Sequence, residues 1–168
     1  MSLLVALFGL CLLGVAAWRD IALRRIPDIA SLGLVVIGLA ARGSEGVAAL
    51  GSSLLCSAIL FGLLVILHTR GLLGGGDVKL AAALAVGLPP LGTYQLVVLT
   101  GLLGGVLGVF YLLLARLLPV AVPAGPEAPF FRRIWAVEAW RIRRRGPLPY
   151  GVAIAGAGAF LLLRPFGG

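Results

Sequence analysis

The sequence predicts an all-α, polytopic membrane protein with about six transmembrane helices and with both termini outside the cytoplasm. Two observations predict this class. Of the 168 residues 61% are hydrophobic and only 12% are charged, whereas about a quarter of the residues in a soluble domain are charged. The apolar residues also gather in long runs that a bilayer would cover. We therefore expect a single membrane domain over residues 1–168 and exclude an ordinary water-exposed globule.

Six apolar runs define the predicted spans. They cover residues 2–18, 29–41, 47–67, 78–90, 91–115 and 148–164. The second and fourth runs hold 13 residues each, which as helix extend about 20 Å and fall short of a hydrocarbon core of about 30 Å. Short spans therefore alternate with long ones.

The connections between the spans are polar and basic. Arg19 to Asp28 is predicted to be a short polar connection, because Pro27 ends any continuing helix. Residues 116–147 form the only sizeable polar segment and contain seven of the fourteen Lys and Arg residues. Within it, residues 119–129 are proline-rich and predicted to be irregular, and residues 130–145 are predicted to form an interfacial or cytosolic helix.

The basic residues predict the orientation in the membrane. With six spans, twelve of the fourteen Lys and Arg residues fall on one side, and Arg42 and Arg164 fall on the other. The positive-inside rule then places segment 116–147 in the cytoplasm and the protein in the cytoplasmic (inner) membrane. A net charge of +8 can also indicate nucleic acid, but these residues build no separate polar domain. Membrane lipid is therefore an expected partner, and nucleic acid is not.

The acidic and metal-binding residue types are few. Cys11 and Cys56 lie in separate apolar runs, so we expect no metal site. The glutamates are expected to lie on solvated surfaces: Glu45, Glu127 and Glu138. The aspartates lie instead at the cytoplasmic ends of spans, where a carboxylate is costly and is a functional candidate: Asp20, Asp28 and Asp77. Two such carboxyls held together share a proton, so one can activate water while the other stabilises an oxyanion.

Three segments resemble motifs of one enzyme family. Gly74-Gly75-Gly76-Asp77-Val78-Lys79 resembles the GxGD motif, with its lysine two residues on, of the type IV prepilin peptidases. Asp20, followed by a basic stretch and by Ile26-Pro27, is similar to the family's other catalytic motif. Pro149 to Ile154 resembles the signature of the family's last helix. The three matches follow the family's order and span nearly the whole chain.

The resemblance implies a membrane aspartyl endopeptidase that needs no cofactor. Its partners would be prepilin-like precursors, whose leader it would cleave at the cytoplasmic face, after a glycine that precedes the hydrophobic segment. On this interpretation Asp20 and Asp77 are the catalytic pair. Pro27, Lys79 and the glycines would shape the site, because glycine permits positive φ and a close approach of another backbone: Gly74, Gly75 and Gly76.

The chain departs from the family pattern in two places. Asp28 stands where relatives usually have Asn after Ile-Pro, and we expect it to cap the second helix. Larger relatives also carry a cytoplasmic insertion with paired cysteines and methylate the new N-terminus, and this chain has no such insertion. It therefore resembles the short form that serves tight-adherence (Flp-type) pili, without N-methyltransferase activity. Lys79 is interpreted as a topology anchor or as a group that lowers the pKa of Asp77.

Two other classes of function remain as alternatives. A small transporter or channel subunit would use Asp20 and Asp77 to bind a cation or proton. A non-catalytic assembly factor would use the basic segment to dock a partner or anionic lipid. A homo-oligomer is compatible with any of the three classes.

Overall fold

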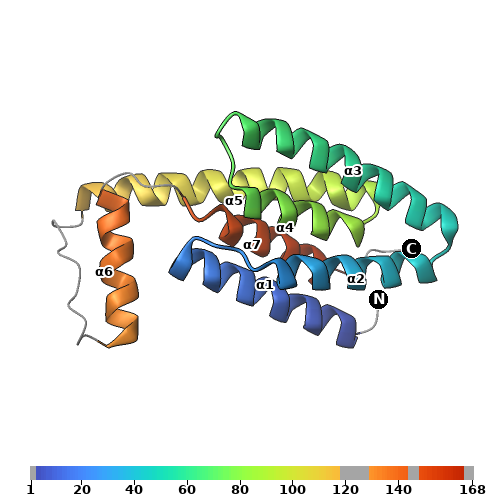
Figure 1. Ribbon diagram of the computed structural model, residues 1–168, viewed down its shortest axis with the longest axis horizontal. Coiled ribbons are helices and arrows are strands. Elements are labelled where there is room, and N and C mark those ends of the chain that lie inside the picture. The colour runs from blue at the N-terminus through green and yellow to red at the C-terminus, as the bar shows by residue number, and fades with distance from the viewer. Residues whose placement is uncertain (1–2, 118–128, 144–147, 165–168) are drawn as a thin grey trace.

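The computed structural model describes residues 3–117, 129–143 and 148–164, and these residues form helices and short connections (Figure 1). The helices are α1 (Leu3–Leu23), α2 (Asp28–Ser44), α3 (Val47–Thr69), α4 (Gly75–Val86), α5 (Pro90–Leu117), α6 (Phe130–Arg143) and α7 (Tyr150–Leu163). No strand occurs in these ranges. The predicted all-α class is therefore confirmed for the described part of the chain.

Three helices are long and apolar enough to cross a bilayer. They are Val5–Leu23 within α1, the 23 residues of α3 and the 28 residues of α5. α7 is apolar but has 14 residues, and α2 and α4 have 17 and 12. The three long helices indicate a membrane protein, whereas the predicted total of about six spans stays a prediction.

The centre of the bundle is the short helix α4. It packs against α2, α3, α5 and α7, and every residue from Leu80 to Val86 is buried. Four of these seven residues are alanines, whose small side chains let neighbouring helices approach closely. The Ser57 hydroxyl of α3 also donates a hydrogen bond of 2.8 Å to the Ala82 carbonyl. α4 is therefore held on all sides by the rest of the fold.

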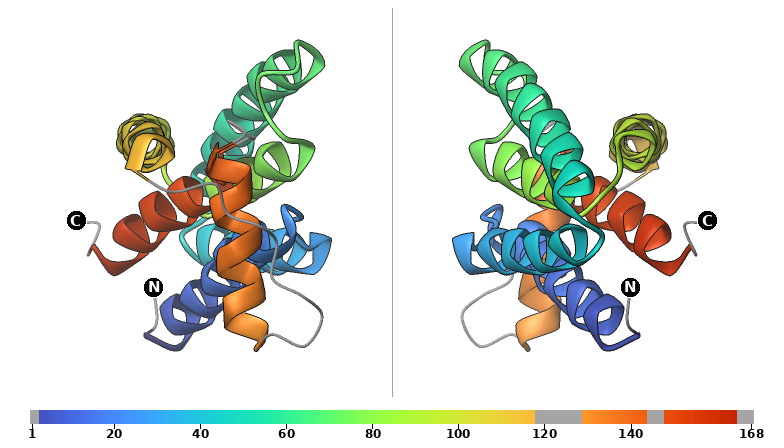
Figure 2. Two further views of the ribbon diagram at one scale, coloured as in Figure 1. Left: turned by 90° about the vertical axis from the view of Figure 1, so that its left-hand side faces the viewer. Right: turned by 90° about the vertical axis from the view of Figure 1, so that its right-hand side faces the viewer.

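One end of the bundle gathers the ends of several helices. α1 ends there and α4 and α7 begin there, while α1 begins and α7 ends at the opposite end (Figure 1). α6 stands across the first of these ends, at a steep angle to the other helices, as Figure 2 shows from both sides. This end therefore brings together residues that are far apart in the sequence.

The boundaries of α1 and α4 differ from the prediction. α1 continues to Leu23, so the predicted polar connection from Arg19 is wrong in its first half. Nothing before Pro27 prevents the helix from continuing, and the Arg24 N–H still donates to the Asp20 carbonyl at 2.9 Å. α4 begins at Gly75, three residues before the predicted span. Both motif aspartates consequently lie within helices.

Two further boundaries shift for local reasons. α4 ends at Val86, and α5 begins at Pro90, which was predicted to end the preceding span. Proline suits the first position of a helix because its missing N–H would have no partner there. α2 extends to Ser44, past its predicted end. Its Arg42 is buried, donates a hydrogen bond of 2.8 Å to the Ser53 hydroxyl and pairs with Glu45.

The polar segment is described only in part. α6 agrees with the predicted helix from residue 130 as far as the described residues go. Residues 118–128, most of the predicted irregular stretch, lie outside the described residues, as do residues 144–147.

Candidate active site

Asp20 is buried near the end of α1 and faces the start of α7. Its side chain is 7% exposed, and its Oδ2 accepts a hydrogen bond of 2.9 Å from the backbone N–H of Gly151, the second residue of α7. The first N–H groups of a helix lack intrahelical partners and carry a partial positive charge. The Gly151 N–H therefore finds its partner in Asp20 and fixes the orientation of the Asp20 carboxyl.

The contact with Asp20 explains why residue 151 is glycine. A Cβ at this position would lie 2.8 Å from Oδ2 of Asp20 and 3.0 Å from Cδ1 of Ile26. Both distances are too short for a carbon atom, and the Asp20 side chain is too short to move away while keeping its hydrogen bond. The segment that resembles the last-helix signature therefore has a physical role, which is to receive the Asp20 carboxyl.

Asp77 lies in the first turn of α4 and is 9% exposed. The backbone N–H of Gly74, which precedes the helix, donates a hydrogen bond to its carboxyl group. In a capping box, the side chain of the third helical residue accepts a hydrogen bond from the N-cap backbone N–H, and Asp77 makes this contact. The contact fixes its carboxyl at the helix N-terminus. Asp77 therefore stabilises the start of α4 and at the same time faces a cavity.

The motif glycines 74–76 allow close contacts, and none of the three has a positive φ. A Cβ on Gly76 would lie 3.1 Å from Cβ of Ile26, in the connection between α1 and α2. A Cβ on Gly75 would meet only the His68 ring at 3.4 Å, which is an ordinary contact. At Gly76, α4 thus packs closely on a side chain of the connection that follows Asp20, and a Cβ on Gly74 would lie 2.8 Å from Oδ2 of Asp77.

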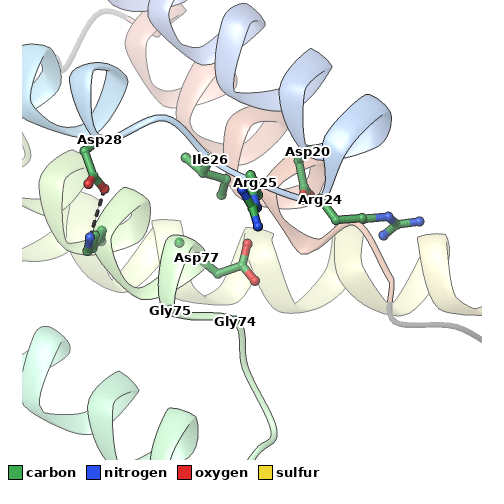
Figure 3. Close-up of a pocket in the computed structure, with 10 residues that line it drawn as sticks. Asp20, Arg24, Arg25, Ile26, Asp28, Gly74, Gly75 and Asp77 are labelled. Carbon is green, nitrogen blue, oxygen red and sulfur yellow. Dashed lines mark hydrogen bonds and ion pairs between the residues drawn. The ribbon is translucent and has the colours of Figure 1, made fainter. Parts of the chain in front are cut away.

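Asp20 and Asp77 line one cavity of about 300 Å³ (Figure 3). The residues around it come from the end of α1, the α1–α2 connection and the start of α4: Asp20, Arg24, Arg25, Ile26, Asp28, Gly74, Gly75, Gly76, Asp77 and Lys79. The structure therefore brings together the two aspartates that the sequence singles out, although 57 positions separate them. Within the described residues no group of three His, Cys, Asp or Glu side chains forms a metal-binding cluster.

The environment of Asp77 favours its protonated form. Asp77 lies outside the three candidate membrane spans. Burial, and then the charge of Asp20, raise the pKa of Asp77 from 3.8 to about 6, against the opposing effects of the Gly74 hydrogen bond and the Arg24 charge. A carboxyl beside a second carboxyl can thus keep its proton close to neutral pH. The pair can supply one proton donor and one proton acceptor to a molecule in the cavity.

Asp28 and Lys79 occupy different places from those predicted. Pro27 holds the N-cap position of α2 and Asp28 is the first helical residue, so Asp28 does not cap the helix. The Asp28 carboxylate instead accepts a hydrogen bond of 2.8 Å from the Lys79 ammonium (dashed line in Figure 3). These side chains are 78% and 56% exposed. Lys79 therefore pairs with Asp28 at the mouth of the cavity, not with Asp77.

Glu138 of α6 is a residue whose position the sequence did not indicate. It was expected on a solvated surface, yet it is 7% exposed. Its carboxylate pairs with Arg24 and with Arg141 at 3.3 Å, and accepts a hydrogen bond of 2.7 Å from the Tyr111 hydroxyl of α5. The three-residue spacing of Glu138 and Arg141 suggests an ion pair within a helix. No sequence pattern links either of them to Arg24.

His68 and Tyr150 are not among the residues that line the cavity. His68 is exposed, and its Nδ1 lies 2.8 Å from the Leu73 carbonyl oxygen, in the loop before α4. Tyr150 is the first residue of α7.

The comparison with known proteins gives one match. The family model of the type IV leader peptidase family matches residues 7–109, a range that includes both Asp20 and Asp77. No curated protein and no solved structure matches the chain. The matched range covers more than half of the sequence and extends from α1 into α5. The chain therefore belongs to the type IV leader peptidase family, which indicates a protease.

Proposed function

We propose that this protein is an aspartic endopeptidase that removes the leader of pilin-like precursors, with Asp20 and Asp77 as its catalytic pair. The observation that carries the proposal is that two buried carboxyls, from α1 and α4, line one cavity. Family membership supports the reaction class, and the predicted orientation places the cavity at the cytoplasmic face of the inner membrane.

The surroundings of the two carboxyls suggest separate roles. Asp20, which receives the Gly151 N–H at the start of α7, is the general base that takes a proton from the attacking water. Asp77, with its pKa raised to about 6, holds the proton that stabilises the developing oxyanion on the scissile carbonyl. As the tetrahedral intermediate collapses, the proton taken by Asp20 passes to the leaving amine and the carbonyl re-forms.

The first test compares three aspartate variants. The protein is co-expressed with a candidate prepilin, and precursor and mature forms are separated by size for wild type, Asp20→Asn and Asp77→Asn. We expect each substitution to abolish detectable cleavage, because an amide can neither accept nor donate the proton in question. Asp28→Asn is the matched control and should still cleave, because Asp28 is exposed and paired with Lys79.

Membrane levels of each variant are measured by immunoblot, so that a loss of cleavage is not a loss of protein. Processing that survives either Asp20→Asn or Asp77→Asn would exclude the pair as the catalytic machinery. Mass spectrometry of the mature pilin N-terminus tests the remaining part of the proposal, peptidase activity without N-methylation. A methylated N-terminus produced by this protein alone would contradict it.

A further inference from the structure

Arg24 places a positive charge beside the aspartate pair. It follows α1 directly and lines the same cavity, and its charge acts on both carboxyl groups. Its backbone has a φ of 53° and its N–H donates to the Asp20 carbonyl, which is the left-handed conformation that commonly ends a helix. Arg24 therefore ends α1 one turn after Asp20.

The group that holds Arg24 is Glu138. The Arg24 Nη2 donates to Glu138, while Nε and Nη1 are buried and have no hydrogen-bond partner within the described part of the chain. Glu138 thus makes the charge-assisted contact of a guanidinium that is 16% exposed. Without Glu138, this largely buried guanidinium would lose the carboxylate to which it donates.

Glu138 is itself fixed from several sides. The Tyr111 hydroxyl of α5 donates to it at 2.7 Å, and Arg141 pairs with it at 3.3 Å. Arg141 also donates a hydrogen bond of 3.2 Å to the carbonyl of Ile21, one residue after Asp20. α6, which stands across this end of the bundle in Figure 2, is therefore joined to the last turn of α1 at two points.

We propose that Glu138 is a positioning residue for the aspartate pair, which acts by holding Arg24 beside both carboxyls. α6 then belongs to the catalytic apparatus, although none of its described side chains lines the cavity. This inference rests on the proposed function, because it assigns Glu138 a role in the same reaction.

The charges around the pair determine the direction of the expected effects. The charged residues beside the pair in the cavity are Arg24 and Arg25, after α1, and Asp28 and Lys79, which pair with each other. The charges of Glu138 and Arg141 from α6 also act on Asp20, and the Tyr111 hydroxyl of α5 donates to Glu138. Tyr150, at the start of α7, packs against Gly104 of α5. Glu138 offsets the positive charges of Arg24 and Arg141. In Glu138→Gln the amide oxygen can still accept a hydrogen bond from Arg24, so this substitution keeps Arg24 in place and removes only the negative charge. The protonated carboxyl then loses its proton at lower pH, and removal of Arg24 has the opposite effect.

The experiment measures cleavage of a purified prepilin as a function of pH in detergent, for wild type, Glu138→Gln, Arg24→Gln and the double variant. We expect the alkaline limb of the profile to move by about half to one pH unit, downward for Glu138→Gln and upward for Arg24→Gln. The double variant should have its limb near the wild-type position, because both charges are gone. In both single variants we expect the fold decrease in kcat to be larger than the fold increase in KM.

Glu45→Gln is the matched control. Glu45 pairs with Arg42 at the α2–α3 turn, outside the cavity, so its removal should leave the profile unchanged. The proposal is overturned if the alkaline limb stays in place in both single variants, or if it moves in the same direction in both. This criterion applies when the wild-type protein cleaves the prepilin in the same assay. If Glu138→Gln does not fold, Arg24→Gln decides: its limb should move upward, and a limb that stays in place or moves downward overturns the proposal. Failure of the proposed function would be recognised separately, by cleavage in Asp20→Asn or Asp77→Asn.

Discussion

At the residue scale, the position of the Asp20 carboxyl depends on one backbone N–H and on the absence of a Cβ at the residue that donates it. Gly151 supplies both, because its N–H donates to Oδ2 and its missing Cβ leaves room for the carboxyl. The two residues are 131 positions apart. A glycine required for backbone freedom would have a positive φ, and Gly151 does not. Close approach is the physical reason here.

This contact makes a specific prediction. Gly151→Ala should lower the rate of prepilin cleavage at least about tenfold, because the added Cβ displaces the Asp20 carboxyl, and a displacement of about 1 Å in a catalytic group can cost about a hundredfold. Gly156→Ala in the same helix is the control, since its Cβ would meet only the flexible end of Leu103 at 3.3 Å. Equal rates for the two variants would show that the Asp20–Gly151 contact is dispensable. Cleavage is measured as before, with protein amounts matched.

At the scale of elements, α4 combines the functional candidate and the core of the bundle. Asp77 lies in its first turn and the alanine-rich remainder is buried among four helices. The helix has only 12 residues, and isolated helices of that length are marginal in water. Its stability must therefore come from packing, which also fixes the position of Asp77.

The packing of α4 can be tested by adding volume. Ala85 is completely buried, and Ala85→Leu should destabilise the protein by about 1–3 kcal/mol through overpacking. The control is Ala58→Leu in α3, where the alanine is exposed and the added side chain meets no core. Thermal unfolding in detergent compares the two. A lower midpoint for Ala58→Leu than for Ala85→Leu would contradict the central position of α4.

At the scale of the whole molecule, the ends of the helices divide into two groups. Asp20, Asp77 and α6 lie at one end, and the turn between α2 and α3 lies at the other (Figure 1). The positive-inside rule assigns the end with the basic residues to the cytoplasm. The fold and the charge pattern are consistent with one orientation, which labelling can check.

The prediction uses a protein in which Cys11 and Cys56 are replaced by alanine. Ser44→Cys, at the exposed end of α2, should react with a membrane-impermeant maleimide on intact spheroplasts, because the predicted topology places this turn outside. Thr69→Cys, at the exposed opposite end of α3, should react only after the membrane is permeabilised. The reverse pattern would invert the proposed topology and move the cavity to the outer face.

The helical fold and the candidate aspartates could be predicted because they depend on local features. Apolar runs predict helices, and a carboxylate at a span end is unusual by itself. Boundaries were less predictable, since Asp20 was assigned to a connection and lies in α1. Asp28 was misassigned as a cap because its partner, Lys79, is 51 residues away.

Composition and short motifs are properties of neighbouring residues, so they were enough to predict the membrane class, the family motifs and the candidate aspartates. The groups that surround those aspartates depend on how the helices pack. The Asp20–Gly151 and Arg24–Glu138 contacts join residues 131 and 114 positions apart. Such pairs arise where helix ends meet after the bundle has packed around α4, and no local periodicity in the chain encodes that meeting.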